Sequence, residues 1–222
     1  MIERGYHDHI LFSCNMRYRY LQSHHLELMK RAGFRKLKMG LESANQTTLD
    51  RLDKGGTVEQ IVEESRLISE AGLDIHLTVM VGYPWESREE AQRMVDLARE
   101  LMAPGHAEML QSTVIVPYPG TRLHTQAVEH NWFRPDLDPL DYSRYDMREP
   151  VLATPDMNPR QVQQLSAKIY QSFLTPRFLR RNLRRVKSLR DLDYLRRGVR
   201  AVFGHSLDFL KPVDGRQGRP AS

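Results

Sequence analysis

The sequence alternates between short apolar runs and amphipathic segments, and this alternation restricts the fold more than any other feature. Apolar runs of strand length lie at Ile10–Cys14 and at residues 37–41, 75–81 and 110–116. They recur roughly every 30 residues, which is the length of one strand–helix–strand unit. Strands joined by helices of this length form right-handed crossovers, so the pattern predicts a parallel sheet with helices outside it.

The intervening segments carry clear helix signals. Thr57 with Gln60, and Ser87 with Glu90, have the spacing of capping boxes, in which a hydroxyl and a polar side chain satisfy the first free amides of a helix. The helices expected between and after the strands cover residues 23–32, a stretch ending at 52, 57–72, 87–101 and 121–129. Each has apolar residues on one face, as a helix packed on a sheet requires.

The predicted fold class is therefore α/β: a partial (β/α) barrel of the TIM type, with about four parallel strands. Four strands make about half of an eight-stranded barrel and leave two strand edges to be covered. We expect something else to complete the sheet. The predicted boundaries are a partial barrel core at 8–130, an irregular connector at 131–157, a helical basic extension at 158–212 and a disordered tail at 213–222.

Composition narrows the functional classes. The chain has 222 residues and one cysteine, Cys14, so it has no internal disulfide and cannot hold a centre that needs several thiolates. No apolar run reaches the roughly 18 residues of a spanning helix, and the N-terminus lacks a signal-peptide core. We expect a cytoplasmic protein, with peripheral membrane contact as a further option. The histidine pairs His7–His9 and His24–His25 are interpreted as surface residues, and no metal ligands are predicted.

The basic charge is concentrated near the C-terminus. Ten cations and two acids lie between Pro176 and Arg200, which gives this segment a net charge of +8. The whole chain carries +5, so the remainder carries −3. Apolar residues recur along one side of the same segment, at Phe178, Leu179, Leu183, Val186 and Leu189. Such a helix can pack on the barrel, lie on an anionic membrane surface or bind nucleic acid, and we favour these options in that order.

Polar or small residues follow three of the strands, where α/β folds place their ligands. Glu42 and Ser43 directly follow the second strand and could bind hydroxyl or ammonium groups; alternatively, Ser43 or Asn45 caps the next helix. Gly82 permits close backbone approach, and Pro117 offers a rigid apolar wall, although a simple turn explains either residue equally well.

These segments together resemble the radical S-adenosylmethionine (radical SAM) superfamily, specifically the subclass that carries an N-terminal cobalamin-binding domain. The resemblance covers roughly residues 8 to 190. The segments that carry it are Cys14-Asn-Met-Arg17, Gly40-Leu-Glu-Ser-Ala-Asn45 with Leu49 and Lys54-Gly-Gly-Thr57, Gly82-Tyr-Pro-Trp-Glu-Ser87, Pro117-Tyr-Pro-Gly-Thr-Arg-Leu123 and the segment from Tyr170 to Phe178.

The resemblance implies a definite chemistry. In this superfamily a 4Fe-4S cluster held by three cysteines binds S-adenosylmethionine, and one electron releases a 5′-deoxyadenosyl radical that abstracts hydrogen from an organic substrate. The cluster-binding Cys-x3-Cys-x2-Cys loop is absent from this sequence, as is the cobalamin domain. Trp85 and Ala44 stand where the family has glycine. Cys14 is interpreted as a small buried apolar residue.

By position, the resemblance assigns cofactor contacts to the second strand and the turn that follows. Glu42 and Ser43 would face the ribose and methionine groups of S-adenosylmethionine, and Lys54 would pair with its methionine carboxylate. Arg17 is assigned to the same site, where it serves the substrate or a neighbouring acid.

The adenine is assigned to the ends of the next two strands. Val81 and Gly82 would lie along the ring, and Pro117 would wall it. No catalytic side chain is identified.

The predicted function is the C-terminal part of a radical SAM enzyme that is catalytic only together with a cluster-binding half. The expected partners are a complementary chain with the Cys-x3-Cys-x2-Cys half barrel, and an organic substrate, with lipid-like and tetrapyrrole compounds as options. Cobalamin would enter through the missing domain, and nucleic acid is not expected. The alternative is a non-catalytic remnant, or a module that binds anionic surfaces through its arginine-rich helix.

Overall fold

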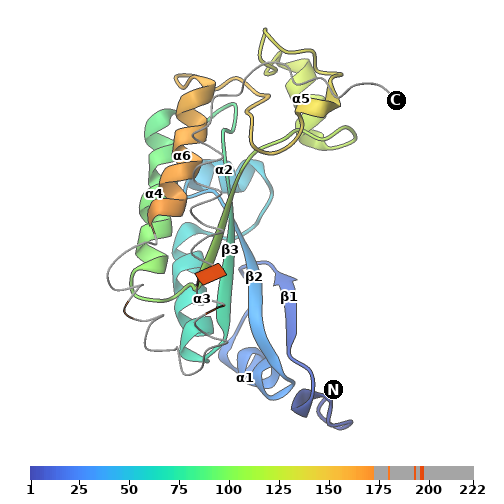
Figure 1. Cartoon of the computed structure of the whole chain (residues 1–222), viewed down its shortest axis with the longest axis vertical. Coiled ribbons are helices and arrows are strands. Elements are labelled where there is room, and N and C mark those ends of the chain that lie inside the picture. The colour runs from blue at the N-terminus through green and yellow to red at the C-terminus, as the bar shows by residue number, and fades with distance from the viewer. Residues whose placement is uncertain (173–179, 181–192, 194–195, 198–222) are drawn as a thin grey trace.

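The computed structural model describes residues 1–172 together with Arg180, Asp193, Arg196 and Arg197 (Figure 1). The basic amphipathic helix predicted around Phe178–Leu189 and the disordered tail predicted at 213–222 lie outside these described residues. Within the described part, no helix is both long and apolar enough to cross a membrane.

A four-stranded parallel sheet forms the centre of the molecule. Its strands are β1 (Phe12–Met16), β2 (Phe34–Glu42), β3 (Asp74–Val81) and β4 (Met109–Val114), and they pair in sequence order. Each strand pairs only with its neighbours in sequence, so the sheet is open, as expected of part of a barrel. The predicted α/β class with four parallel strands is confirmed.

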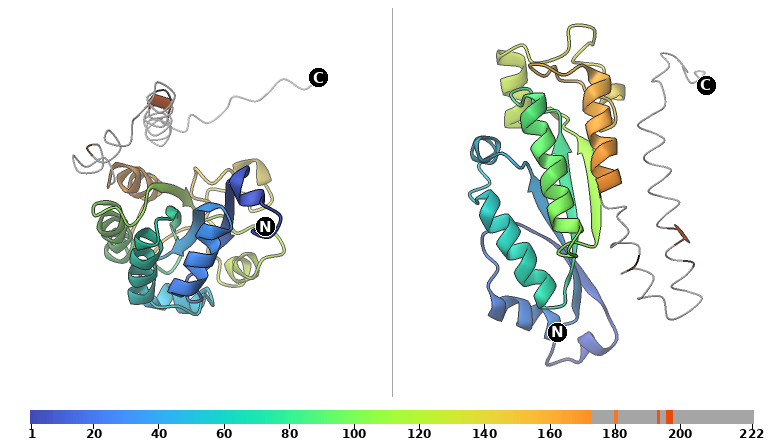
Figure 2. Two further views of the ribbon diagram at one scale, coloured as in Figure 1. Left: turned by 90° about the horizontal axis from the view of Figure 1, so that it is seen from below. Right: turned by 90° about the vertical axis from the view of Figure 1, so that its left-hand side faces the viewer.

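Helices cover one face of the sheet (Figures 1 and 2). The helices on this face are α1 (Ser23–Arg31), α3 (Val58–Glu70), α4 (Arg88–Met102) and α6 (Pro159–Ser172). α1 packs on β2, α3 on β3, α6 on β4 and β3, and α4 on α6. The short helices α2 (Gln46–Arg51) and α5 (Arg122–Glu129) follow the carboxyl ends of β2 and β4, and 3-10 turns lie at Tyr6–Asp8 and Tyr142–Arg144.

The alternation of side chains along the strands explains this layering. In β2 the residues Leu37, Met39 and Leu41 are fully buried against the helices, and alternate residues of β3 and β4 join them. The polar residues between them point to the opposite face. Cys14 of β1 pairs in register with Leu37 of β2 and packs against the same core. This position agrees with its interpretation as a small apolar residue.

The capping boxes predicted at two helix starts are confirmed, whereas most strand boundaries differ from the prediction by one to three residues. The Thr57 side chain accepts from the amide of Gln60, and Ser87 accepts from Glu90. β1 begins at Phe12 rather than Ile10, because the Ile10 amide donates to Tyr6 in the preceding turn. β4 ends at Val114, two residues before the predicted end at 116, because the chain turns away toward Pro117.

Residues 131–157 form a second small core beyond the carboxyl ends of the strands (Figure 1). Its pairing is limited to one antiparallel bridge between Phe133 and Leu152. Arg134 and Arg144 both form ion pairs with the largely buried Glu149. These pairs connect separate parts of the segment. Val151 and Leu152 pack against Tyr83 and Ile115 at the strand ends, so this segment covers one side of the region where a ligand would bind.

The outer edge of β4 is covered by a tyrosine rather than by another strand. The Tyr170 hydroxyl, from α6, accepts from the amide of Ser112 and donates to its carbonyl, both at 3.0 Å. The Val114 amide donates to the carbonyl of Met147. Of the two open edges expected from a four-stranded sheet, the β4 edge is therefore partly covered within the chain, at Ser112 and Val114. No other strand in the described residues pairs with the outer edge of β1.

Replacing Tyr170 with phenylalanine should destabilise the fold, because both peptide groups of Ser112 lose their partner while they stay buried. We expect a loss of about 1–3 kcal/mol in the free energy of unfolding, measured by urea denaturation. Tyr142→Phe is the matched control, since that side chain is 53% exposed, and it should leave stability unchanged. Equal stability of Tyr170→Phe and wild type would contradict the edge-covering role.

Candidate functional site

The carboxyl end of β2 carries an acid in an unusual backbone conformation. Glu42 has a φ of 58°, which a residue with a side chain seldom adopts, and the register with β3 shifts between Gly40 and Glu42. The Glu42 side chain is 13% exposed and pairs with the Lys54 ammonium at 2.7 Å. Backbone strain of this kind often marks a functional position.

Arg17 holds the turn that carries Lys54. One guanidinium nitrogen of Arg17 donates to the carbonyls of Asp53 and Lys54, at 3.1 and 3.0 Å. The loop after β1 is fastened in turn by Glu64 of α3, whose carboxylate accepts from the Arg19 amide at 2.7 Å. Burial raises the pKa of Glu64. The structure thus brings Arg17, Glu42 and Lys54 together at one edge of the sheet.

Ser43 takes part in a buried hydrogen-bond network around Glu86. Glu86 is 3% exposed, and one of its oxygens accepts from Ser43 and Thr48 at 2.6 Å and from Asn45 at 3.0 Å. The side-chain nitrogen of Asn45 also donates to the Glu90 carbonyl, and the side-chain oxygen of Asn45 accepts from Arg93. This network joins the loop after β2 to the loop after β3.

The alternative of a helix cap holds by position but not by side-chain capping. Asn45 is the N-cap residue of α2, yet its side chain makes no capping hydrogen bond. The Ser43 hydroxyl accepts from the Asn45 amide at 3.1 Å and donates to Glu86. The Ser43 hydroxyl is therefore engaged by protein groups on both sides. Glu86 lies within the segment from Gly82 to Ser87, but its role is not visible in the sequence, because spacing does not reveal which loop a buried carboxylate will meet.

Gly82 is required by its neighbours on the helix side. Its φ is 89°, and a Cβ at this position would lie 2.9 Å from a methyl carbon of Val162 on α6. The Val81 side chain is buried in the core, so only its backbone can face a ligand. Pro117 is also buried. The Ile115 amide donates to the Val81 carbonyl, which places the start of the Pro117 segment beside Gly82.

Aromatic side chains line the loop after β3. Tyr83 is fully buried and stacks on Trp85 with ring centres 5.3 Å apart, and Trp132 meets Trp85 edge-on. Burial and the nearby Glu42 and Glu86 carboxylates hold the pKa of Tyr83 well above its usual value, so its hydroxyl stays neutral. Trp85 does not have a positive φ, so its replacement of the family's glycine causes no backbone conflict.

The site's residues fit S-adenosylmethionine but not an iron–sulfur cluster. The paired Glu42 carboxylate and Lys54 ammonium offer the opposite charges that an amino-acid group needs. A cluster needs several thiolates, whereas the sequence contains Cys14 alone, and burial raises the pKa of that thiol. The described residues contain no group of three metal-binding side chains.

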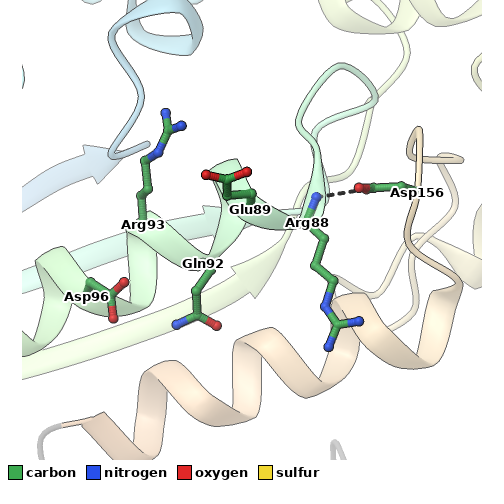
Figure 3. A pocket seen from close by; sticks show the side chains of 6 residues that line it. All are labelled: Arg88, Glu89, Gln92, Arg93, Asp96 and Asp156. Carbon is green, nitrogen blue, oxygen red and sulfur yellow. Dashed lines mark hydrogen bonds between the residues drawn. The ribbon is translucent and has the colours of Figure 1, made fainter.

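A hollow lies beside the N-terminal half of α4 (Figure 3). It has a volume of about 570 Å³ and is lined by Arg88, Glu89, Gln92, Arg93, Asp96 and Asp156. The Arg88 amide donates to Asp156 at 2.7 Å. Cations and acids alternate around it, so it has no clear preference for a ligand of either charge.

Comparison with known proteins agrees with the parallel α/β fold. Residues 2–98 match the model of the radical SAM superfamily. This match confirms the resemblance to the superfamily that the motifs indicate.

Two curated relatives are similar over about 68% of this chain. An uncharacterized methyltransferase of Pyrococcus horikoshii is 30% identical over 152 residues, and the anaerobic magnesium-protoporphyrin IX monomethyl ester cyclase of Cereibacter sphaeroides is 25% identical over 154. This chain spans 31% and 24% of their lengths.

Two solved structures match at 17% identity. Elp3 of Methanocaldococcus infernus aligns with a TM-score of 0.48, over 73% of this chain and 41% of that one. The methyltransferase TsrM of Kitasatospora setae, with cobalamin and a 4Fe-4S cluster bound, aligns with a TM-score of 0.49, over 75% and 33%.

Replacing Glu86 with alanine should loosen both loops at this edge, because three buried donors lose their acceptor. We expect a loss of about 2–4 kcal/mol in the free energy of unfolding and a smaller loss for Glu86→Gln, which keeps an acceptor oxygen.

The matched control is Glu89→Ala, one residue into the exposed start of α4, which should cost no more than about 0.5 kcal/mol. Amide hydrogen exchange at Ser43 and Asn45 should accelerate in Glu86→Ala and not in Glu89→Ala. Unchanged exchange in Glu86→Ala would show that the network does not hold the loop.

Proposed function

We propose that this chain supplies part of the S-adenosylmethionine pocket of a radical SAM enzyme. The observation that carries the proposal is the Glu42–Lys54 pair, held by Arg17 at the carboxyl edge of a parallel sheet within a radical SAM match. Lys54 holds the methionine carboxylate of the cofactor through a charge-assisted hydrogen bond. Glu42 accepts from its ribose hydroxyls or its ammonium group.

The remaining residues shape the pocket rather than react. The Gly82 backbone lies along the adenine, and Pro117 and the buried Val81 limit the space around it. Ser43 acts through its bond to Glu86, which keeps the strained Glu42 backbone in place. This role of Ser43 replaces a direct contact with the cofactor as the preferred assignment, because Ser43 is only 1% exposed and its hydroxyl donates to the buried Glu86.

The cluster that reduces S-adenosylmethionine lies outside these residues in this proposal. When bound, such a cluster supplies the electron that releases the deoxyadenosyl radical. We propose that a complementary chain with the Cys-x3-Cys-x2-Cys half barrel holds it and extends the sheet at the outer edge of β1. The open β1 edge, beside the exposed Ile10 and Leu11, supports that placement, since an unpaired edge accepts a further strand.

Cobalamin is a further proposed cofactor, bound by a domain outside this sequence. It is supported by the motif resemblance to the cobalamin-binding subclass. The substrate is proposed to be organic. The relatives include a cyclase that, by its name, acts on a magnesium-protoporphyrin ester, so a tetrapyrrole is one candidate substrate.

The direct test is anaerobic reconstitution with iron, sulfide and a reductant, scored for 5′-deoxyadenosine. We expect release when the chain is combined with a polypeptide carrying the Cys-x3-Cys-x2-Cys half barrel, encoded by a neighbouring gene, and no release from this chain alone. Release by this chain alone would overturn the interpretation of Cys14, and no release from the combination would overturn the proposed function.

Removing either charge of the site pair should lower S-adenosylmethionine affinity in the combined protein. We expect Lys54→Met and Glu42→Gln each to weaken binding roughly tenfold, the value of one charge-assisted hydrogen bond. Calorimetry with S-adenosylmethionine measures the change. Lys168→Met is the matched control, because Lys168 is exposed on α6, and it should bind as the wild type does. Equal affinity in all three variants would place the cofactor elsewhere.

A further inference from the structure

The face of the sheet opposite the helices is polar and carries two lysines. Side chains alternate along each strand, so the residues between the buried apolar ones share this second face. We call it the basic face and define it by Asn15 of β1, Lys36 and Lys38 of β2, His76 of β3, and Gln111 and Thr113 of β4. The strand register places Asn15, Lys38 and His76 side by side. In Figures 1 and 2, α1, α3, α4 and α6 lie on the other side of the sheet.

The two ammonium groups on this face have weak partners. Lys38 reaches the side-chain oxygen of Gln111 at 3.5 Å, across β3, and Lys36 reaches the sulfur of Met109 at 3.2 Å. Among the described residues, no carboxylate lies within ion-pair distance of either nitrogen. An ammonium group whose protein contacts are only a neutral amide or a thioether carries an uncompensated charge, and it would gain a charge-assisted hydrogen bond from an anion.

The other polar side chains on the basic face are also suited to binding an anion. Burial, with Lys38 and Lys36 nearby, lowers the pKa of His76, so its ring is neutral near pH 7 and can donate one hydrogen bond. Asn15 and Gln111 add amide donors. The acids that share this face lie near its two ends: Asp74, which pairs in register with Lys36, and Glu42, which is bound to Lys54. The centre of the face is therefore the cationic part.

We propose that the basic face binds an anionic group of the substrate, a carboxylate or a phosphate, with Lys38 and Lys36 as its cations and Asn15, His76 and Gln111 as hydrogen-bond donors. The inference rests on the proposed function, which puts the cofactor at the carboxyl edge of the same sheet. It deepens that function by naming the class of substrate. A wholly apolar, lipid-like substrate would leave both lysines uncompensated, whereas an organic acid or phosphate ester would pair with them.

The test uses the full chain without cofactor, so it does not depend on radical chemistry. Inorganic phosphate and, separately, acetate are titrated at constant ionic strength set with sodium chloride, and the His76 ring signals are followed by NMR. We expect a saturable shift of these signals with both anions. In Lys38→Met the affinity should fall roughly tenfold, and Lys36→Met should also weaken binding, because each change removes one cation. Lys168→Met, on α6, should match the wild type.

Each outcome bears on the proposal. The absence of a saturable His76 shift at constant ionic strength, or equal binding by Lys38→Met and wild type, would overturn it. Should a complementary half barrel abolish phosphate binding while deoxyadenosine release persists, the lysines pair with that polypeptide's acids and the proposal is wrong. Phosphate binding without deoxyadenosine release would support the anion site and reject the proposed radical function, so the two failures are distinguishable.

Discussion

A buried carboxylate that accepts three hydrogen bonds holds the functional edge of this sheet together. Glu86 lies after β3, and its donors Ser43, Asn45 and Thr48 all follow β2. A carboxylate removed from water is stable only when its oxygen is paired in this way. The adjacent Glu42 can therefore keep a left-handed backbone, since the residue that follows it is fixed. The geometry of the proposed cofactor pocket depends on this one contact.

The two faces of the sheet divide the work of the chain. One face buries an apolar layer under four helices and provides the stability. The opposite face carries lysines and amides that do not contribute to that core. Polar residues that do not stabilise the fold are expected at a binding surface rather than at a packing surface. The edges differ in the same way: the Tyr170 hydroxyl covers part of the β4 edge, whereas no strand in the described residues pairs with the outer edge of β1. Further strands of a complete barrel can therefore be added to this sheet at the β1 edge.

Local patterns predicted the elements well, because their causes are local. The capping boxes at Thr57 and Ser87 depend on residues three positions apart, and strand alternation depends on period-two spacing, so both are visible in the sequence. Strand ends were less accurate. Ile10 has the apolar character of a strand residue, yet its amide is used by a turn with Tyr6. The site was only partly foreseen: Arg17, Glu42 and Lys54 do meet, whereas the Ser43 hydroxyl turns to Glu86.

The sequence by itself determined the class of fold, the order of its elements and the resemblance of residues 2–98 to the radical SAM superfamily, because periodicity and motif spacing are properties of a linear chain. Only the tertiary structure decided which partners the polar groups take. Ser43 and Glu86 are 43 residues apart, as Tyr170 and Ser112 are 58, and no local signal couples such positions. Their contacts arise when parallel strands bring distant loops to one edge, where each buried polar group must find a partner.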